Sequence, residues 1–539
     1  MTSSKSLGLL VIVIALLVSW RGAWADLAGE DAASASAHGE VSERLMFRNP
    51  GAGAVARSVQ GKLQDIVDVA DFGARCDGVS DDTAAINAAL KYVGSKGPGT
   101  VWLLDKKAPC RISATLTVPA GVTLNGGRGQ RAGLSARLPN LNPMIALAGD
   151  GASIRGIYIN AGAAGANTSG TAIAMSNVVG ASIDDVYLES PFIGIDLNGN
   201  QARLSNSIVN GIRGRGSIGI RVGAATTWAR TVDARVLHTS VISAADAPAD
   251  ADLLVLDAGG LIVESSDMLW AKVGTLIAPG ENQHVLWGSF SNTYVGDTNA
   301  QYALRIEPAS SRASVYGIQC NGCWTASAGT DNIFIGNANH GKLAAIYFNG
   351  LRNYAARGNG ARLSGGSFIT FDASHFCGNG SGQANILVDA PVSRLMVRNS
   401  ELGAQCGGLF ETRPRFGILL KDRVDGASIV GNDFTGPLEA VGGAPVGNSV
   451  VADNVGLDNG PVHVAAASSI SVGAMSVASI SGTAPIREIL PAWAGRSLRL
   501  ITTDGAVAFA PGGNICAGYR STRDVPVDAY YDGRCWYLK

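Results

Sequence analysis

A recurring strand pattern constrains the fold of this chain more than any other feature. Seven segments between residues 261 and 435 each begin with alternating apolar residues and end in a small turn. Between the two lies a marker position, which is polar or aromatic in nearly every segment. The marker residues are Glu264, Trp287, Gln319, Asn349, Asp372, Arg398 and Gly431, at spacings of 23, 32, 30, 23, 26 and 33 residues. One strand-bearing unit at such a period, with no convincing long helix after residue 110, predicts a solenoid of β-coils.

Other repeat architectures fit this pattern less well. Leucine-rich repeats have a similar period but a fixed Leu/Asn template, and a propeller needs about four strands in each repeat of ~40 residues. The 70 glycines suit a β-rich chain with many tight turns. The pattern therefore predicts an all-β, right-handed parallel β-helix over residues 61–460, with an N-terminal cap at 61–125.

The N-terminus has the pattern of an export signal. Lys5 precedes a short apolar run, and the small residues Ala23 and Ala25 follow it. We expect a signal peptide over 1–25, a flexible segment over 26–60 and a secreted or periplasmic protein without a membrane span after processing. The net charge of −1 lacks the basic excess that nucleic-acid binding requires.

The stretch "VDVADFGARCDGVSDDTAAINAALKYV", residues 67–93, combines aspartates, glycines and a helical pattern. Ser80 and Asp81 are candidate helix N-caps, and Asp81 and Asp82 place negative charge at the positive end of the helix dipole. The apolar face of the predicted helix consists of Ala85, Ile86, Ala89, Leu90 and Val93.

This stretch resembles the N-terminal signature of the pectate lyase superfamily of parallel β-helix proteins, which includes proteins related to glycoside hydrolase family 28. The resemblance covers Asp71-Phe72-Gly73-Ala74, Asp77-Gly78 and Asp81-Asp82-Thr83, and continues through "GTVWLL" and "LTVPAGVTLNGG". It implies a β-helix whose first coil is covered by the capped helix. We expect the four aspartates Asp71, Asp77, Asp81 and Asp82 to build that cap and to carry no chemistry.

Residues 461–539 change in character to short strands with turns, which we expect to pair antiparallel in a small C-terminal β module. Its role as a solenoid cap, a homo-oligomer contact or a glycan-binding module stays open. Among the eight cysteines, the spacings favour Cys516 with Cys535 and Cys76 with Cys110. Cys320, Cys323, Cys377 and Cys406 form the remainder, in which a zinc site is the less favoured alternative to disulfides.

Equivalent positions of a β-helix stack with a rise of roughly 4.8 Å per coil. The marker positions therefore predict a polar and aromatic ladder that suits a polysaccharide, with its many hydroxyls and apolar ring faces. A solvated outer face is the alternative. The expected substrate-binding residues are Trp287, Gln319, Asn349, Arg398 and His238.

Glycoside hydrolysis uses two carboxyl groups about 5–5.5 Å or 6.5–9.5 Å apart. The first choice is Asp372 and Glu401 as that pair, because these residues fall on neighbouring units, with His375 either tuning the pair or relaying a proton. The second choice is Glu264 with Asp267, one unit after His238.

A secreted polysaccharide-degrading hydrolase is therefore the favoured function, without a cofactor. A polysaccharide lyase, which would use a base and in many cases calcium held by aspartates, is one alternative. A non-catalytic glycan-binding or structural protein is the other. Of the short motifs of family 28 hydrolases, the sequence has only partial matches, at Asp184-Asp185 and His340-Gly341. The Asp-Pro-His element of alginate epimerases is absent.

Overall fold

The computed structural model describes residues 43–103, 108–127, 132–223, 231–403, 406, 412–443, 445–456, 462–473 and 475–539. The expected signal peptide lies outside these ranges. The chain divides into two compact units: the first ends at Asp68, and the second begins at Val69. Among the described residues of the first unit, the segment expected to be flexible contains β1 (Met46–Phe47), β2 (Arg57–Ser58) and the start of α2 (Val59–Leu63). β3 (Val67–Asp68) follows.

The second unit begins with the N-terminal cap. A short 3-10 helix, η1 (Val69–Phe72), leads to α3 (Thr83–Lys96). Ile86, Ala89, Leu90 and Val93 of α3 are buried, which confirms the predicted apolar face. The N-cap position falls on Asp82, one residue after the expected Asp81. The Asp82 side chain makes no bond to the helix and accepts instead from the backbone N–H groups of Arg75 and Cys76.

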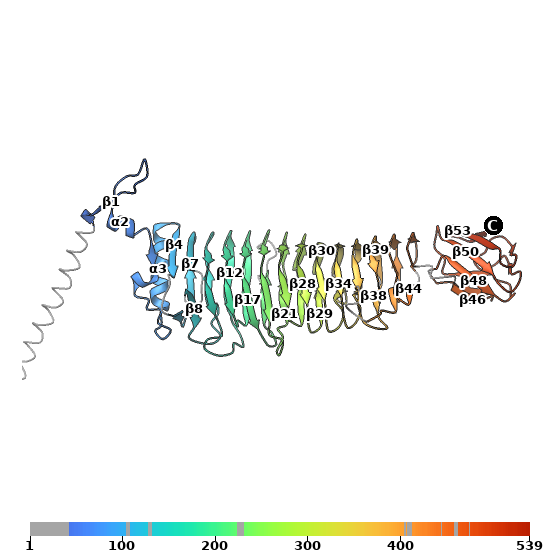
Figure 1. Ribbon diagram of the computed structural model, residues 1–539, viewed down its shortest axis with the longest axis horizontal. Helices are drawn as coiled ribbons and strands as arrows, with labels where there is room; N and C mark the ends of the chain where they lie inside the picture. Colours follow the sequence, from blue (N-terminus) through green and yellow to red (C-terminus); the bar gives the residue numbers. More distant parts are fainter. Residues whose placement is uncertain are drawn as a thin grey trace, which may run out of the picture. The chain divides into compact units, whose positions relative to one another are not determined.

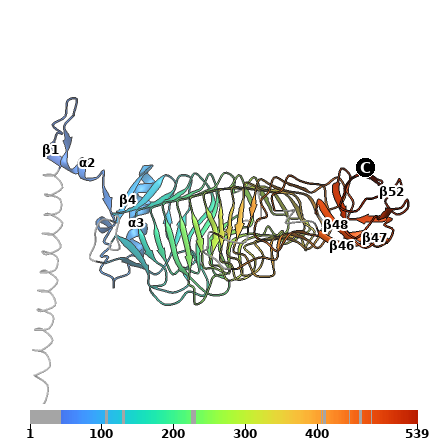
Figure 2. The same ribbon diagram turned by 45° about the vertical axis from the view of Figure 1, so that its right-hand side comes forward.

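Three sheets of parallel strands follow, as predicted for a right-handed parallel β-helix, with successive coils lying side by side (Figures 1 and 2). Sheet I is defined by β4 (Gly99–Leu103), β7 (Val122–Gly126), β10 (Ser153–Arg155), β13 (Ser182–Asp184), β16 (Arg203–Ser205), β19 (Arg235–Leu237), β22 (Ala258–Gly259), β23 (Ile262–Glu264), β26 (His284–Leu286), β27 (Ser289–Ser291), β30 (Ser314–Asn321), β33 (Lys342–Asn349), β36 (Ser367–Asp372), β39 (Val392–Arg398), β42 (Val424–Asp425), β43 (Ser428–Val430) and β45 (Val450–Ala452).

Sheet II is formed by β5 (Cys110–Ile112), β8 (Gly133–Ala136), β11 (Tyr158–Asn160), β14 (Tyr187–Glu189), β17 (Ile208–Ile212), β20 (Ser240–Ser243), β24 (Asp267–Leu269), β28 (Tyr294–Asp297), β31 (Trp324–Ala326), β34 (Arg352–Tyr354), β37 (His375–Cys377) and β40 (Glu401–Leu402). Sheet III is formed by β6 (Leu116–Val118), β9 (Ile145–Leu147), β12 (Thr171–Val179), β15 (Ile193–Asn200), β18 (Ile218–Val222), β21 (Ala251–Val255), β25 (Val273–Ile277), β29 (Tyr302–Ile306), β32 (Ile333–Gly336), β35 (Ala361–Ser364), β38 (Ala384–Val388), β41 (Phe416–Leu420) and β44 (Glu439–Gly442).

The core of the coils is a set of stacked inward columns. One column of sheet I is at most 2% exposed at every position and consists of Leu204, Val236, Val263, Phe290, Cys320, Phe348, Phe371, Val397 and Ile429. Because side chains alternate across a strand, the residues on either side of this column face outward. Those outward columns present side chains to the outside on every coil.

A tight bend joins sheet I to sheet II on each coil. In the coil of β36 and β37 the bend is Ala373, in the left-handed region with φ 47°, followed by buried Ser374. The Ser374 N–H donates to the Ser400 hydroxyl of the next coil at 3.1 Å, and the Ser400 N–H donates to Asn432 at 3.0 Å. This internal polar ladder fixes where each strand of sheet II begins.

The C-terminal module has its own strands. Its main sheet consists of β46 (Val462–Ala465), β48 (Val477–Ser481), β50 (Ser497–Thr502), β53 (Pro526–Tyr531) and β54 (Trp536–Leu538). Two smaller sheets pair β47 (Ser469–Ser471) with β49 (Glu488–Leu490) and β51 (Ala508–Phe509) with β52 (Tyr519–Arg520). The antiparallel prediction holds for β50, β53 and β54 but is wrong for β46, β48 and β50, which pair in parallel.

Four disulfides are formed: Cys76–Cys110, Cys320–Cys323, Cys377–Cys406 and Cys516–Cys535. The two pairs favoured by sequence spacing are confirmed, and the other four cysteines form disulfides rather than a zinc site. Disulfides are typical of proteins that fold in an oxidising extracellular or periplasmic environment. No helix within the described ranges has the length and apolarity needed to cross a membrane.

Candidate active site

An outward column of sheet II brings aromatic, basic and acidic side chains together on successive coils. Parallel pairing aligns the first residues of β28, β31, β34, β37 and β40, and an isolated bridge extends the column by one coil. The column reads Tyr294, Trp324, Arg352, His375, Glu401 and Asp433. We name it the sheet II column.

His375 is oriented by groups on the two neighbouring coils. The Tyr354 hydroxyl lies 3.0 Å from His375 Nδ1, and His375 Nε2 lies 3.5 Å from a carboxylate oxygen of Glu401. Burial raises the pKa of Tyr354, with Arg352 lowering it and Glu401 raising it further. The protonated phenol can therefore donate to Nδ1, which leaves the Nε2 proton facing Glu401.

Glu401 and Asp433 form a carboxyl pair on adjacent coils. The Asp433 N–H donates to the Ser400 carbonyl at 2.9 Å and the Leu402 N–H donates to the Asp433 carbonyl at 2.8 Å, so both side chains leave the same face. The coil rise separates their backbones by roughly 4.8 Å. The Thr435 N–H, 2.7 Å from Asp433 Oδ1, holds one oxygen of that carboxylate.

The alignment of the repeat units did not reveal Asp433, because it set the last unit one residue out of register. The marker Gly431 was set against Arg398, whereas the structure pairs Arg398 with Val430. With that shift, "RNSE" at 398–401 aligns with "VGND" at 430–433, and the second acid becomes visible. Tyr354 carried no sequence signal, since it belongs to the neighbouring outward column.

Aromatic rings lead up to this cluster. The Tyr294 and Trp324 ring centroids are 5.2 Å apart, those of Trp324 and Tyr354 are 4.8 Å apart, and those of Tyr354 and His375 are 5.2 Å apart. Tyr294 is 39% exposed. A chain of contacting rings therefore leads along sheet II to His375 and the two carboxylates.

The structure places Asp372 on a different sheet from Glu401. Asp372 ends β36 of sheet I, where its carboxylate accepts from Arg398 at 3.3 Å and from Asn399 at 3.1 Å. Glu401 begins β40 of sheet II and faces His375. The predicted His375–Glu401 adjacency is present, and Asp372 lies around the bend with partners of its own.

The second predicted cluster is split in the same way. Glu264 ends β23 of sheet I, and Asp267 begins β24 of sheet II, where it accepts from the Ser240 hydroxyl at 2.9 Å. His238 occupies the bend of the preceding coil, and its backbone N–H donates to the Glu264 carbonyl at 3.0 Å. Five coils, about 24 Å at the coil rise of roughly 4.8 Å, separate His238 from the bend before His375.

The predicted binding ladder of sheet I is corrected at two positions. Asn349, Asp372 and Arg398 stand in one column with Glu264, as predicted. The coils between carry Ser291 and Asn321 at that column, because Gln319 pairs two residues earlier with Ser289 and Tyr347. Trp287 is 61% exposed at a bend after β26, with its ring 5.1 Å from that of Tyr316. On this coil sheet I has two short strands, β26 and β27, separated by the bend at Trp287. The marker positions assigned from sequence at Trp287 and Gln319 therefore lie out of register with the column.

Sheet I also carries a polar groove of about 990 Å³ over its earlier coils. Its charged lining consists of Arg155, Asp184, Arg203, Asp233 and Arg235, with His238 at one end. Arg155 pairs with Asp184 at 3.4 Å. The groove offers hydrogen-bonding groups to a polar chain, and the described residues that line it include no Phe, Tyr or Trp.

Metal ligation has little support among the described residues. The one group of three potential ligands found there is Cys76, Asp82 and Cys110. Both cysteines belong to a disulfide, and Asp82 is occupied by two backbone N–H groups. These residues do not fit a zinc or calcium site.

Comparison with solved structures places the chain among parallel β-helix proteins. A double mutant of the tailspike protein of E. coli bacteriophage HK620 has a TM-score of 0.52 and 11% identity, covering 92% of this chain and 96% of its own. A mutant of that tailspike in complex with a pentasaccharide gives a TM-score of 0.51 with 11% identity and the same coverage. The A-module of the mannuronan C-5 epimerase AlgE6 of Azotobacter vinelandii gives 0.50 and 16%, covering 72% of this chain and 98% of its own.

These similarities define the fold class. No protein-family model matches the chain. No curated protein sequence matches it either. The resemblance noted at residues 71–83 is thus supported at the level of the β-helix.

Proposed function

We propose that the protein is an exported glycan-degrading enzyme that hydrolyses a polysaccharide lying along the sheet II column. The observation that carries this proposal is the order of side chains along that column. Contacting aromatic rings lead directly to a histidine and to two carboxyl groups on adjacent coils. Sugar rings pack their apolar faces on aromatic side chains, while their hydroxyls and glycosidic oxygens bond to polar groups.

The carboxyl pair gives the chemistry. The backbone spacing of roughly 4.8 Å between Glu401 and Asp433 is close to the ~5–5.5 Å that separates the carboxyl groups of retaining glycosidases. Asp433, held by the Thr435 N–H, acts as the nucleophile. Asp433 attacks the anomeric carbon as the glycosidic bond breaks, and Glu401 donates its proton to the leaving oxygen. Glu401 then takes a proton from the water that attacks the same carbon and displaces Asp433. His375, whose Nε2 lies 3.5 Å from a Glu401 carboxylate oxygen, orients that carboxyl group.

The known proteins of this fold support a glycan as the ligand class. One solved relative is named as a mannuronan C-5 epimerase, and another is a phage tailspike bound to a pentasaccharide. At 16% and 11% identity they support the class of ligand and leave its sugar and linkage open. The resemblance of residues 71–83 to proteins related to family 28 glycoside hydrolases points in the same direction.

A polysaccharide lyase is the second candidate, because Arg352 precedes His375 in the sheet II column. The arginine could neutralise the carboxylate of a uronate, and the histidine could then remove the proton from the carbon next to that carboxylate. A binding protein without catalysis is the third. The two readouts of a single assay separate all three functions.

The test uses the purified protein with a panel of neutral and uronate-containing polysaccharides. New reducing ends alone indicate hydrolysis, reducing ends together with an ultraviolet-absorbing unsaturated product indicate a lyase, and neither signal indicates binding only. Glu401→Gln and Asp433→Asn should each lose at least ~100-fold in turnover, since removing a general acid or base typically costs 10²–10⁴-fold.

Glu264→Gln is the matched control, an exposed carboxylate on sheet I that should retain its activity. If Asp372→Asn is inactive and Asp433→Asn is active, the second carboxyl group comes from sheet I. If Glu264→Gln alone is inactive, the site lies four coils before His375, and the assignment to the sheet II column is wrong.

A further inference from the structure

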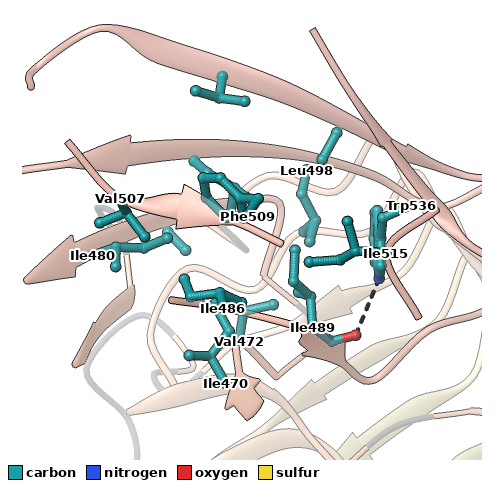
Figure 3. Packing of buried hydrophobic residues seen from close by; sticks show 14 residues of the cluster. Ile470, Val472, Ile480, Ile486, Ile489, Leu498, Val507, Phe509, Ile515 and Trp536 are labelled. Atoms are coloured by element: carbon teal, nitrogen blue, oxygen red, sulfur yellow. Dashed lines mark hydrogen bonds between the residues drawn. The ribbon is translucent and has the colours of Figure 1, made fainter. Parts of the chain in front are cut away.

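The C-terminal module presents an open groove that the proposed hydrolysis does not use. The module has its own core, in which Trp536 is fully buried and donates from Nε1 to the Ile489 carbonyl at 3.1 Å (Figure 3). β50, β53 and β54 turn one face toward this core and the other outward. The outer face carries a groove of about 670 Å³, a size in the usual range of small-ligand sites.

Two tyrosines stand side by side in this groove. Tyr530 of β53 and Tyr537 of β54 are directly paired across the strands, and they are 49% and 50% exposed. About half of each side chain is therefore accessible to a ligand. Tyr537 is oriented by a hydrogen bond to Asp532.

Polar groups surround the two rings. Arg499 donates to both oxygens of Asp528, at 3.0 and 3.5 Å, and this hydrogen bonding lowers the pKa of Asp528. Ser476, Ser497 and Lys539 complete the polar lining. Because the arginine and the aspartate satisfy each other, the groove offers flat rings and hydrogen-bonding groups with little net charge.

We propose that this groove is a second carbohydrate site, which binds a neutral glycan chain through Tyr530 and Tyr537. A neutral sugar matches the lining because it has apolar ring faces for the tyrosines and hydroxyls for the ion pair. A second copy of the chain fits less well, since protein interfaces are depleted of lysine and aspartate, and Asp528 and Lys539 both line this face. The proposal does not depend on the activity proposed for the sheet II column.

The test is affinity electrophoresis of the full chain in gels containing hydroxyethylcellulose, a neutral β-glucan, or polygalacturonate. The neutral polymer should retard the wild-type protein. Tyr530→Ala and Tyr537→Ala should each weaken that retardation by about 3- to 10-fold, the range for one aromatic contact, and the double variant should lose more. Tyr537→Phe keeps the ring and should bind. Val525→Ala, an exposed site of the module outside the groove, is the control.

Each remaining outcome decides against the site. Unchanged retardation of the double variant, retardation by polygalacturonate alone, or no retardation of the wild-type protein would overturn the proposal. So would an oligomer of the wild-type protein that dissociates in the double variant, measured by sedimentation equilibrium, because the face would then contact another copy. Glu401→Gln should be retarded like the wild-type protein, which separates this site from the proposed catalytic site.

Discussion

At the scale of single residues, Asp257 holds a carboxyl group that is 1% exposed in the turn after β21. Burial raises the pKa of Asp257 to about 6, and a hydrogen bond from the His284 N–H opposes the shift. Its Oδ2 has no hydrogen-bond partner among the described residues. The folded protein therefore binds this proton more tightly than the unfolded chain.

This predicts a measurable pH dependence of stability. Below the unfolded pKa of about 4 both states are protonated, and between about 4 and 6 only the folded state keeps the proton. The stability contribution of Asp257 should therefore decrease as pH rises through that window, by on the order of 1–2 kcal/mol after allowance for solvent screening. Asp257→Asn should remove that part of the decrease. Equal pH slopes for the two proteins in urea unfolding at pH 4–7 would contradict the assignment.

Part of the candidate site could be predicted from residue patterns in the sequence, and part could not. His375 and Glu401 were predicted as neighbours because each follows its marker residue, Asp372 or Arg398, by three positions. The prediction of their pairing holds because the bend has the same length on both coils. Asp372 was placed with them because sequence spacing cannot show the change of sheet at Ala373. Tyr354 and His375 stand in two different outward columns of sheet II, and the sequence does not show that their side chains are in contact.

At the scale of elements, the N-terminal cap supports a structural role for its aspartates. Asp82 is 2% exposed and accepts from the N–H groups of Arg75 and Cys76, while Asp81 binds Thr83 and the Ser113 hydroxyl of the first coil. These bonds tie the start of α3 to the loop before it and to the strand beneath it.

Asp82→Ala should therefore destabilise the protein more than Asp81→Ala. The first change leaves buried donors unpaired, at about 1–3 kcal/mol, and the second removes a cap-type interaction worth about 0.5–2 kcal/mol. Chemical unfolding measures both, and the folded fraction of each variant should keep its full activity. Lost turnover with unchanged stability would mean that the cap aspartates take part in the chemistry.

The coils were predictable as elements, whereas their register was only partly so. Alternating apolar residues and glycine-rich turns identify each strand, because every coil must bury one face against the same core. Register failed where a coil is interrupted, as at Trp287 and Gln319, since bends made by residues other than glycine leave no clear sequence signal. The parallel pairing of β46, β48 and β50 was missed for lack of a repeat in that region.

At the scale of the whole molecule, the chain combines a stack of coils with a module that has a separate core. The stack offers a long row of equivalent positions, and His375, Glu401 and Asp433 form the proposed catalytic cluster within it. The module offers two open tyrosines. If both sites bind the same polysaccharide, a long chain can be held at two points, whereas a short oligosaccharide can occupy one site only.

Holding a polymer at two points raises its effective concentration at the catalytic site without any new contact there. The Tyr530→Ala/Tyr537→Ala double variant should therefore raise KM by at least ~10-fold on a polysaccharide that the wild-type protein cleaves and that retards it in gels. Its kcat on that polymer should be unchanged, because the sheet II column is intact. On an oligosaccharide of a few residues, both constants should match those of the wild-type protein, with Val525→Ala as the control on both substrates. An equal rise in KM on the short substrate, or a fall in kcat, would mean that the substitutions disturb the catalytic site and that the two sites do not act separately.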